Sequence, residues 1–137
     1  MDKNEREMRE RINALLTEQS LAVLSTQRNG QPYSSLMAFA HTEDLANLVV
    51  ATGKSTRKHQ NIVMDSRVSL LVDNRSNSEE DFHSAAALTI LGGARPIDSD
   101  ERAVFEAIYL KRHPYLQKFL HSPTTTFIKI EVQHYLM

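Results

Sequence analysis

Three cations, Lys54, Arg57 and Lys58, gather at one turn of the stretch NLVVATGKSTRKHQNI, residues 47–62. A helix is expected to begin at this turn, and the N-terminus of a helix already carries roughly +0.5 of a charge. Cations placed there forgo roughly 0.3–1 kcal/mol that an acid would contribute. The cluster becomes favourable if an anion, most simply a phosphate, binds among the cations and the free backbone N–H groups. We therefore predict a phosphate-binding site at this turn; a solvated basic turn is the alternative.

The elements that must hold these cations follow from the same stretch. Residues 47–52 contain a short apolar run that predicts a buried strand, and Gly53 interrupts it. Ser55 or Thr56 can then cap a helix over residues 56–65 by accepting a hydrogen bond from its first turn. The cations would thus lie at the junction of a strand and a helix.

Composition limits the classes of function. The chain has 137 residues, of which 41% are hydrophobic and 24% charged, which is ordinary for a globular domain. With a net charge of −1, the chain lacks the broad positive field that non-specific nucleic-acid binding requires. The absence of Cys excludes disulfides, thiolate chemistry and cysteine-rich metal sites. The charged N-terminal segment is unlike a secretory signal, and no apolar run is long enough to span a membrane, so we expect a cytoplasmic protein.

The remaining periodicity predicts one mainly β domain, of the α+β class, over residues 1–137. The Asn29-Gly30 pair indicates a hairpin, and Gly92-Gly93 suggests a bulge or a close backbone approach. Six strands are expected, at residues 21–26, 33–40, 47–52, 67–73, 85–94 and 125–136. Helices are expected over residues 3–18 and 56–65, after a capping box at Asp98 and Glu101, and over 114–120, with a polar loop at 74–83. This order predicts a six-stranded antiparallel barrel with peripheral helices, since the strands are mostly connected by hairpins.

One motif near the cations suggests different chemistry. Residues 53–56 match the end of the P-loop pattern G-x-x-x-x-G-K-[ST], and the strand ending at Asp73 mimics its magnesium-binding strand. The first glycine of the pattern would fall at Leu48, inside the predicted strand, so the loop could not wrap around two phosphates. The sequence therefore disfavours a nucleoside triphosphatase, which would bind ATP with magnesium and ignore flavin.

Several stretches together resemble the pyridoxamine 5′-phosphate oxidase-like superfamily of FMN-binding split barrels. They are LAVLST, NGQPYSSLMAF, VVATGKSTRKHQNI followed by SRVSLLV, and LTILGGARPI, and they cover nearly the whole chain. The resemblance implies a split β-barrel and assigns the FMN phosphate to the segment Thr56-Arg57-Lys58, with Thr52 close to the phosphate end. It also implies that the strand residues Ser35, Leu36, Met37 and Ala38 lie along the flavin ring and ribityl chain.

Two departures narrow the function that the resemblance implies. The oxidase itself has an Arg near the position of Ser35 and a Gln near that of Ala87, and it has a C-terminal extension that binds pyridoxal phosphate; this chain lacks all three. Oxidation of vitamin B6 is therefore not expected. The pattern is closer to the haem-utilisation and general-stress branches, which are small flavin- or haem-binding dimers.

The resemblance thus implies a homodimer that binds FMN in clefts shared between subunits and acts as an oxidoreductase on a small-molecule substrate. A second copy would cover the flavin face that one small barrel leaves open. A non-catalytic flavin- or haem-binding protein is the alternative, and F420 or haem in place of FMN stays open. No catalytic residue stands out, and flavin chemistry does not require one from the protein.

The histidines and the late aromatic residues have a simpler interpretation. Six His are scattered along the chain without a metal-binding spacing, so we expect them at the surface or at an interface and predict no metal site. Tyr109, Tyr115 and Phe119 could form an aromatic rim for a planar substrate. Packing of a helix pair against the barrel is the favoured interpretation.

Overall fold

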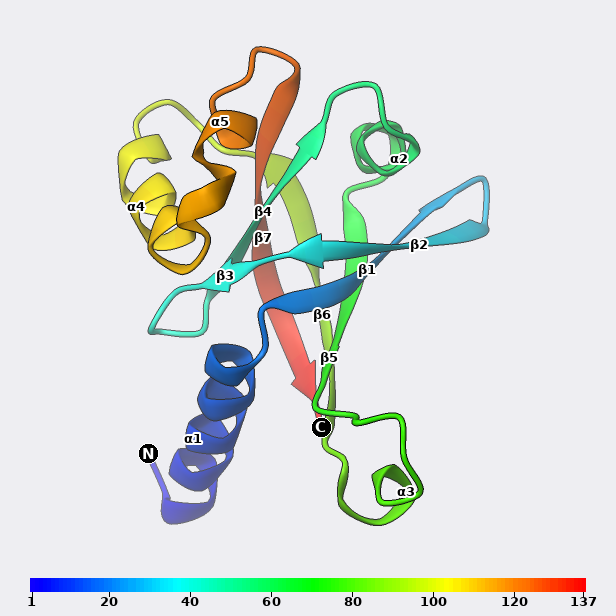
Figure 1. Ribbon diagram of the computed structural model, residues 1–137, viewed down its shortest axis with the longest axis vertical. Coiled ribbons are helices and arrows are strands. Elements are labelled where there is room, and N and C mark those ends of the chain that lie inside the picture. Colours follow the sequence, from blue (N-terminus) through cyan, green and yellow to red (C-terminus); the bar gives the residue numbers. More distant parts are fainter.

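The computed structural model describes all 137 residues and contains one curled antiparallel sheet, a half-barrel with helices around it (Figure 1). Seven strands pair in the order β2-β1-β5-β6-β7-β4-β3. Their bounds are β1 Leu21–Arg28, β2 Gln31–Ala38, β3 Ala40–His41, β4 Asn47–Gly53, β5 Arg67–Asp73, β6 Ala87–Pro96 and β7 Thr125–Leu136. The predicted α+β antiparallel split-barrel fold is confirmed.

The seventh strand arises because the predicted strand 33–40 divides at Phe39. Residues before Phe39 pair with β1, whereas Ala40 and His41 pair with β4 at the opposite edge of the sheet. The side chain of Phe39 is fully buried and its backbone N–H donates to the Ser20 carbonyl, 3.3 Å away. The chain therefore leaves one edge of the curled sheet and joins the other within a single residue.

The helices are α1 Lys3–Glu18, α2 Arg57–Met64, α3 Asp81–Ser84, α4 Arg102–Arg112, a 3-10 turn Pro114–Leu116 and α5 Gln117–Leu120. The region predicted as the polar loop 74–83 contains the start of α3. The Asp81 carboxylate folds this loop by accepting the N–H groups of Ser76 and Asn77, each 2.7 Å away.

The predicted capping box before α4 is wrong. Helix α4 begins one residue after Glu101, and no side chain caps its N-terminus. Instead, the carboxylates of Asp98 and Glu101 bind the Arg95 guanidinium, and Glu101 also accepts from the buried Lys129 ammonium at 2.5 Å. A buried ammonium without a counter-charge is strongly unfavourable, and Glu101 supplies that counter-charge to Lys129.

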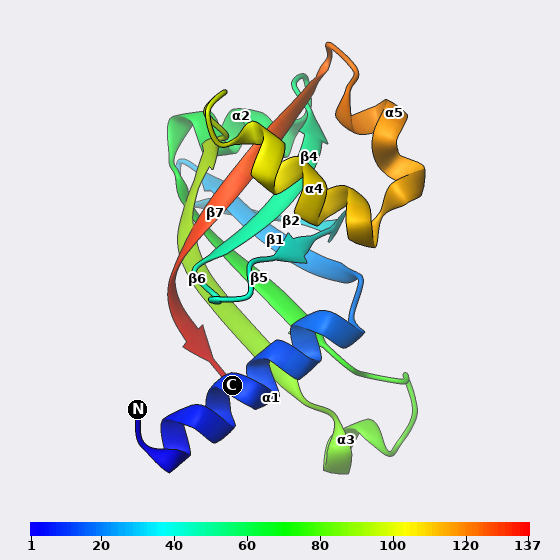
Figure 2. The ribbon, with the colours of Figure 1, turned by 90° about the vertical axis from the view of Figure 1, so that its left-hand side faces the viewer.

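Two apolar clusters lie on opposite faces of β4. The larger fills the half-barrel, and α1 packs against it with Ile12, Leu15 and Leu16. The smaller lies where α4 and α5 cover the outer face of β3, β4 and β7 (Figure 2). Strands β1, β5 and β6 alternate between buried and less buried positions, whereas β4 is buried at five consecutive residues. Burial on both faces explains why four consecutive residues, Leu48 to Ala51, are apolar.

The expected irregularity at Gly92-Gly93 is confirmed. The pairing of β6 with β7 shifts register between Leu91 and Gly92. A Cβ atom at position 92 would lie 2.5 Å from the Glu131 carbonyl oxygen, whereas at position 93 it would meet nothing within 4 Å. The first glycine is therefore required by close approach of the neighbouring strand.

Asp65 fixes the end of α2 to the sheet and should make stability depend on pH. Its carboxylate accepts from the Arg67 side chain at 2.6 Å and backbone at 3.0 Å, and from the Gln27 amide of β1. Hydrogen bonds from the Arg67 side chain, foremost, hold the Asp65 pKa well below its ordinary value. A carboxylate with a lowered pKa stabilises the folded state above its unfolded pKa of about 4, and this contribution disappears as the pH falls through the folded pKa.

We therefore expect Asp65→Asn to lower the free energy of unfolding near neutral pH, and the difference from wild type to shrink below about pH 4. Urea denaturation at several pH values measures it. Glu79→Gln, which neutralises an exposed carboxylate of the loop before α3, is the matched control. If the free energies of unfolding of Asp65→Asn and wild type differed by the same amount at every pH, the prediction would be contradicted.

Candidate functional site

A pocket of about 390 Å³ lies between β2, β4 and the start of α2, with α4 and α5 forming its far wall. We call it the β2–β4 pocket. Its lining residues are Leu36, Met37, Ala38, Ala51, Thr52, Gly53, Thr56, Lys58, Tyr109 and Phe119. The structure thus gathers all the predicted site residues except Ser35 and Arg57 around one pocket.

Strand β2 forms one wall through three consecutive residues. Leu36 is 64% exposed whereas Met37 is buried, because successive side chains on a strand point to opposite faces. Ser35 precedes them without lining the pocket, and its hydroxyl is buried without a hydrogen-bond partner. β2 therefore presents backbone and apolar atoms to whatever occupies the pocket.

The opposite end of the pocket is polar. Thr56 is the N-cap of α2, as predicted: its hydroxyl accepts from the His59 N–H at 3.3 Å and donates to the Gly53 carbonyl at 2.8 Å. The hydroxyls of Thr52 and Thr56 lie 3.2 Å apart, and the half-buried Lys58 completes this end. No acidic residue occupies the first turn of α2. This end combines hydroxyls, a cation and a helix N-terminus, which suits a phosphate.

Arg57 and Lys58 do not share a pocket. The Arg57 guanidinium lies over the Tyr33 ring, 5.3 Å from its centroid, and lines a different cavity beside the β1–β2 hairpin. Consecutive residues of a helix point about 100° apart, so the two cations diverge once the helix forms. Lys54 is exposed and lines neither cavity. The three cations that are adjacent in sequence therefore do not form a single cluster in space.

The sequence predicted part of the aromatic wall of the pocket. Tyr109 is 1% exposed, packs edge-on against Phe127 at 5.4 Å and still lines the pocket, and Phe119 lies beside it. Burial, with a smaller effect of Tyr115, raises the pKa of Tyr109 to about 12, so its phenol stays a hydrogen-bond donor. Tyr109 therefore both packs against the barrel and lines the β2–β4 pocket, whereas Tyr115 is 76% exposed.

His113 contradicts the expected surface location of the histidines. It is 1% exposed, and its Nε2 lies 2.7 Å from the Phe39 carbonyl oxygen. It ends α4, the helix that presents Tyr109, and its ring lies 5.2 Å from the Tyr109 ring. A hydrogen bond to backbone makes it a structural residue, and an isolated sequence position gave no signal of this burial.

Arg112 anchors the same helix. Its guanidinium donates to the carbonyls of Leu16, Thr17 and Gln19 at 2.8, 3.1 and 2.6 Å, so it caps the C-terminus of α1 from the end of α4. It also lies over the Phe39 ring at 5.2 Å. These bonds fix α4, and with it the aromatic wall of the pocket, relative to α1.

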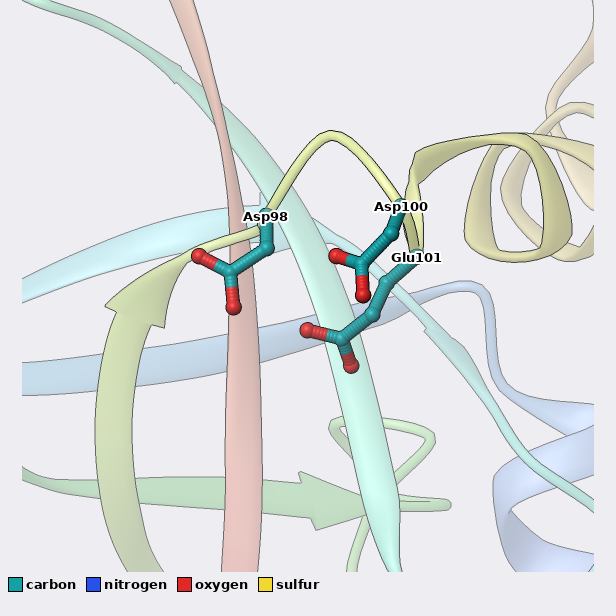
Figure 3. Close-up of side chains that lie close together, drawn as sticks. All are labelled: Asp98, Asp100 and Glu101. Atoms are coloured by element: carbon teal, nitrogen blue, oxygen red, sulfur yellow. The ribbon is translucent and has the colours of Figure 1, made fainter.

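A separate acidic group, Asp98, Asp100 and Glu101, gathers before α4 with ligand atoms within 4.8 Å of one another (Figure 3). Arg95 and Lys129 bind two of the three carboxylates, as described above. Asp98 and Glu101 thus belong to an ion-pair network that joins the start of α4 to β6 and β7, whereas Asp100 takes part in no salt bridge.

The P-loop interpretation fails on geometry. Leu48, which stands where the first glycine would be, is fully buried within β4 and paired with Ile130. No loop is present there to wrap around a triphosphate. As for membranes, none of the helices combines the length and the apolar character that a transmembrane helix needs.

Solved structures with the same fold include haem and flavin proteins. A haem-binding protein from Mycobacterium smegmatis aligns with a TM-score of 0.81 and 17% identity, over 93% of this chain but only 53% of its own. HutZ, the haem storage protein of Vibrio cholerae, aligns with a TM-score of 0.80 and 15% identity, over 93% of this chain and 92% of its own. An FAD-binding protein from Mesorhizobium loti aligns with a TM-score of 0.73 and 15% identity, over 92% of this chain and 88% of its own.

The chain thus spans about half the length of the mycobacterial protein, and identities this low relate the fold alone. No curated protein matches it by sequence. Residues 8–137, nearly the whole chain, match the pyridoxamine 5′-phosphate oxidase family. This chain is a member of that family.

Proposed function

We propose that this protein binds FMN in the β2–β4 pocket and is an oxidoreductase for a small-molecule substrate that is not yet identified. The observation that carries the proposal is the composition of that one pocket. Apolar residues of β2 line its side, and Thr52, Thr56 and Lys58 form its polar end. A flavin mononucleotide has the same division into a planar ring and a phosphate. The FAD-binding protein of the same fold supports a flavin as occupant.

The residues present fit this cofactor. Leu36, Met37 and Ala38 would lie along the flavin, while the Lys58 ammonium and the two threonine hydroxyls would hold the phosphate. The protonated Tyr109 phenol, which lines the pocket, provides a polar group toward the ring. FMN, when bound, supplies hydride or electron transfer, and the protein binds and orients it. Arg57 would reach the phosphate only if its side chain left Tyr33.

A homodimer is part of the proposal. The pocket is open to solvent, and its rim includes Leu36 and Phe119, which are 64% and 43% exposed. Exposed apolar residues around a ligand pocket are favourable if a second subunit covers them. The second subunit would also shield the flavin ring from water. Dimerisation and cytoplasmic location remain predictions.

The second candidate is a protein that binds flavin or haem without catalysis. It is favoured by the similarity of fold to a haem-binding and a haem storage protein. Against haem, no His lines the β2–β4 pocket, so this subunit offers no imidazole ligand there. Haem would need a ligand from elsewhere, whereas FMN needs only the groups already in place.

Titration of the flavin-free protein with FMN, followed by quenching of flavin fluorescence, tests the proposal. We expect saturation at one FMN per subunit. Adding a reduced nicotinamide and an electron acceptor to the complex should then give repeated bleaching and reoxidation of the flavin. Binding without turnover over a panel of donors would favour the non-catalytic candidate. Binding of haem but not FMN, or of neither, would contradict the proposed function.

A further inference from the structure

A second cavity, of about 620 Å³, lies on the other side of α2 and shares no residue with the β2–β4 pocket. We call it the hairpin pocket. It is lined by Arg28, Asn29, Gln31, Pro32 and Tyr33 of the β1–β2 hairpin and by Arg57, Gln60 and Asn61 of α2. Its volume lies in the range of roughly 300–1,000 Å³ that is typical of small-molecule sites. Nothing in the proposed function uses it.

The charges of the hairpin pocket are all positive. Arg28 and Arg57 line it, no acidic residue does, and neither guanidinium takes part in a salt bridge. The nearby Asp65 is bound to Arg67 and Gln27. Two guanidinium groups without a salt-bridge partner thus line one cavity, and each offers the fork of N–H donors that matches the oxygens of a phosphate.

The geometry also favours a planar ring. The Arg57 guanidinium lies over one face of Tyr33, 5.3 Å from the ring centroid, and both residues line the cavity. Guanidinium planes and aromatic rings are the surfaces on which nucleic-acid bases stack in proteins. A base can therefore extend this stack within the cavity while its phosphate binds Arg28.

Asn61 adds a specific hydrogen-bond requirement. It is 2% exposed, its amide nitrogen donates to the Thr26 hydroxyl at 3.0 Å, and its Oδ1 is buried without a partner. A buried acceptor without a donor is unfavourable, and native proteins rarely leave one. Since Asn61 lines the cavity, an N–H group of the ligand can satisfy it, as the exocyclic amine of adenine does with Asn or Gln in DNA complexes.

We infer that the hairpin pocket binds an adenine nucleotide, with its phosphate on Arg28 and Arg57 and its base toward Asn61. Two kinds of molecule carry such an adenylate group. A free adenine nucleotide, including the adenylate half of a nicotinamide donor, would bind independently. Alternatively, the adenylate half of a flavin dinucleotide could reach it from the β2–β4 pocket, because Arg57 and Lys58 are consecutive residues; this second source alone depends on the proposed function.

Isothermal titration of the flavin-free protein with AMP tests the inference directly. We expect saturable binding that Arg28→Gln weakens by about tenfold or more, because each charge-assisted contact to a phosphate is strong. Arg57→Gln should weaken it similarly. Arg11→Gln removes the same charge from the exposed surface of α1, outside both cavities, and should leave AMP binding unchanged.

Comparing the affinities of the protein for FAD and for FMN distinguishes these two sources of the adenylate group. If the dinucleotide spans both pockets, FAD binds more tightly than FMN and Arg28→Gln abolishes that advantage. If the site takes a free nucleotide, FAD and FMN bind equally and AMP binds to the FMN complex as well as to the free protein. Both results support an adenylate site.

Failure to bind AMP at millimolar concentration, or equal binding by wild type and Arg28→Gln, would overturn the inference. These results are independent of whether FMN binds the β2–β4 pocket, since AMP is titrated without flavin. Conversely, failure of the FMN titration would leave the AMP result intact. The two proposals can therefore fail separately.

Discussion

Lys58→Ala is expected to weaken FMN binding by about 10- to 100-fold, the largest effect of any single change in the β2–β4 pocket. A charge-assisted hydrogen bond to a phosphate contributes roughly 1.5–3 kcal/mol, and each 1.4 kcal/mol is a factor of about ten in affinity. Lys58 is the one cation that lines this pocket. Fluorescence titration of the flavin-free variant with FMN measures the dissociation constant.

Two other variants define the specificity of that result. Lys54→Ala removes an exposed cation four residues away that lines neither cavity and should change the affinity less than twofold. Arg57→Ala should have a smaller effect on FMN than Lys58→Ala, because Arg57 lies over Tyr33 in the structure. An unchanged dissociation constant in Lys58→Ala would refute the placement of the phosphate.

Gly92→Ala should be the most damaging small substitution in the sheet. The added Cβ would lie 2.5 Å from the Glu131 carbonyl oxygen and 3.1 Å from the Ile130 side chain. Because the closest atom belongs to backbone that is hydrogen-bonded in β7, the strands must separate. Overpacking of this kind costs about 1–3 kcal/mol of unfolding free energy. Urea denaturation followed by circular dichroism measures the change.

Gly93→Ala is a matched control one residue away. Its Cβ would meet nothing within 4 Å, and its φ is not in the left-handed region. Replacing glycine by alanine where the backbone conformation suits both residues stabilises the folded protein by about 0.4–1 kcal/mol, because the unfolded chain then has less conformational entropy. The two variants should therefore shift the unfolding midpoint in opposite directions. Equal effects would mean that the close approach at Gly92 is relieved without cost.

Local patterns in the sequence were sufficient for most of the fold. Short apolar stretches located β1, β5 and β6, and the Asn29-Gly30 pair located the first hairpin. The cap at Thr56 was also predictable, because the side chain that caps a helix acts on residues only a few positions away. Of the residues of β2 and β4 that the family resemblance placed near the cofactor, all but Ser35 line one pocket.

Features that depend on contacts between residues far apart in the chain could not be predicted from the sequence. Arg57 and Lys58 appear as one cluster in sequence, but the helix turns them toward different cavities. His113 is buried because it meets a carbonyl 74 residues away, and Lys129 is buried because Glu101 comes to it from another element. For His113 and Lys129 the partner lies far along the chain, where residue spacing carries no signal.

The bonds of Arg112 to the end of α1 give the N-terminal helix a role in the ligand pocket that it never touches. Loosening that helix would free α4 to shift, and Tyr109 would move with it. Affinity for the proposed FMN would thereby depend on how the first nineteen residues dock, so a change that detached α1 would weaken FMN binding from a distance.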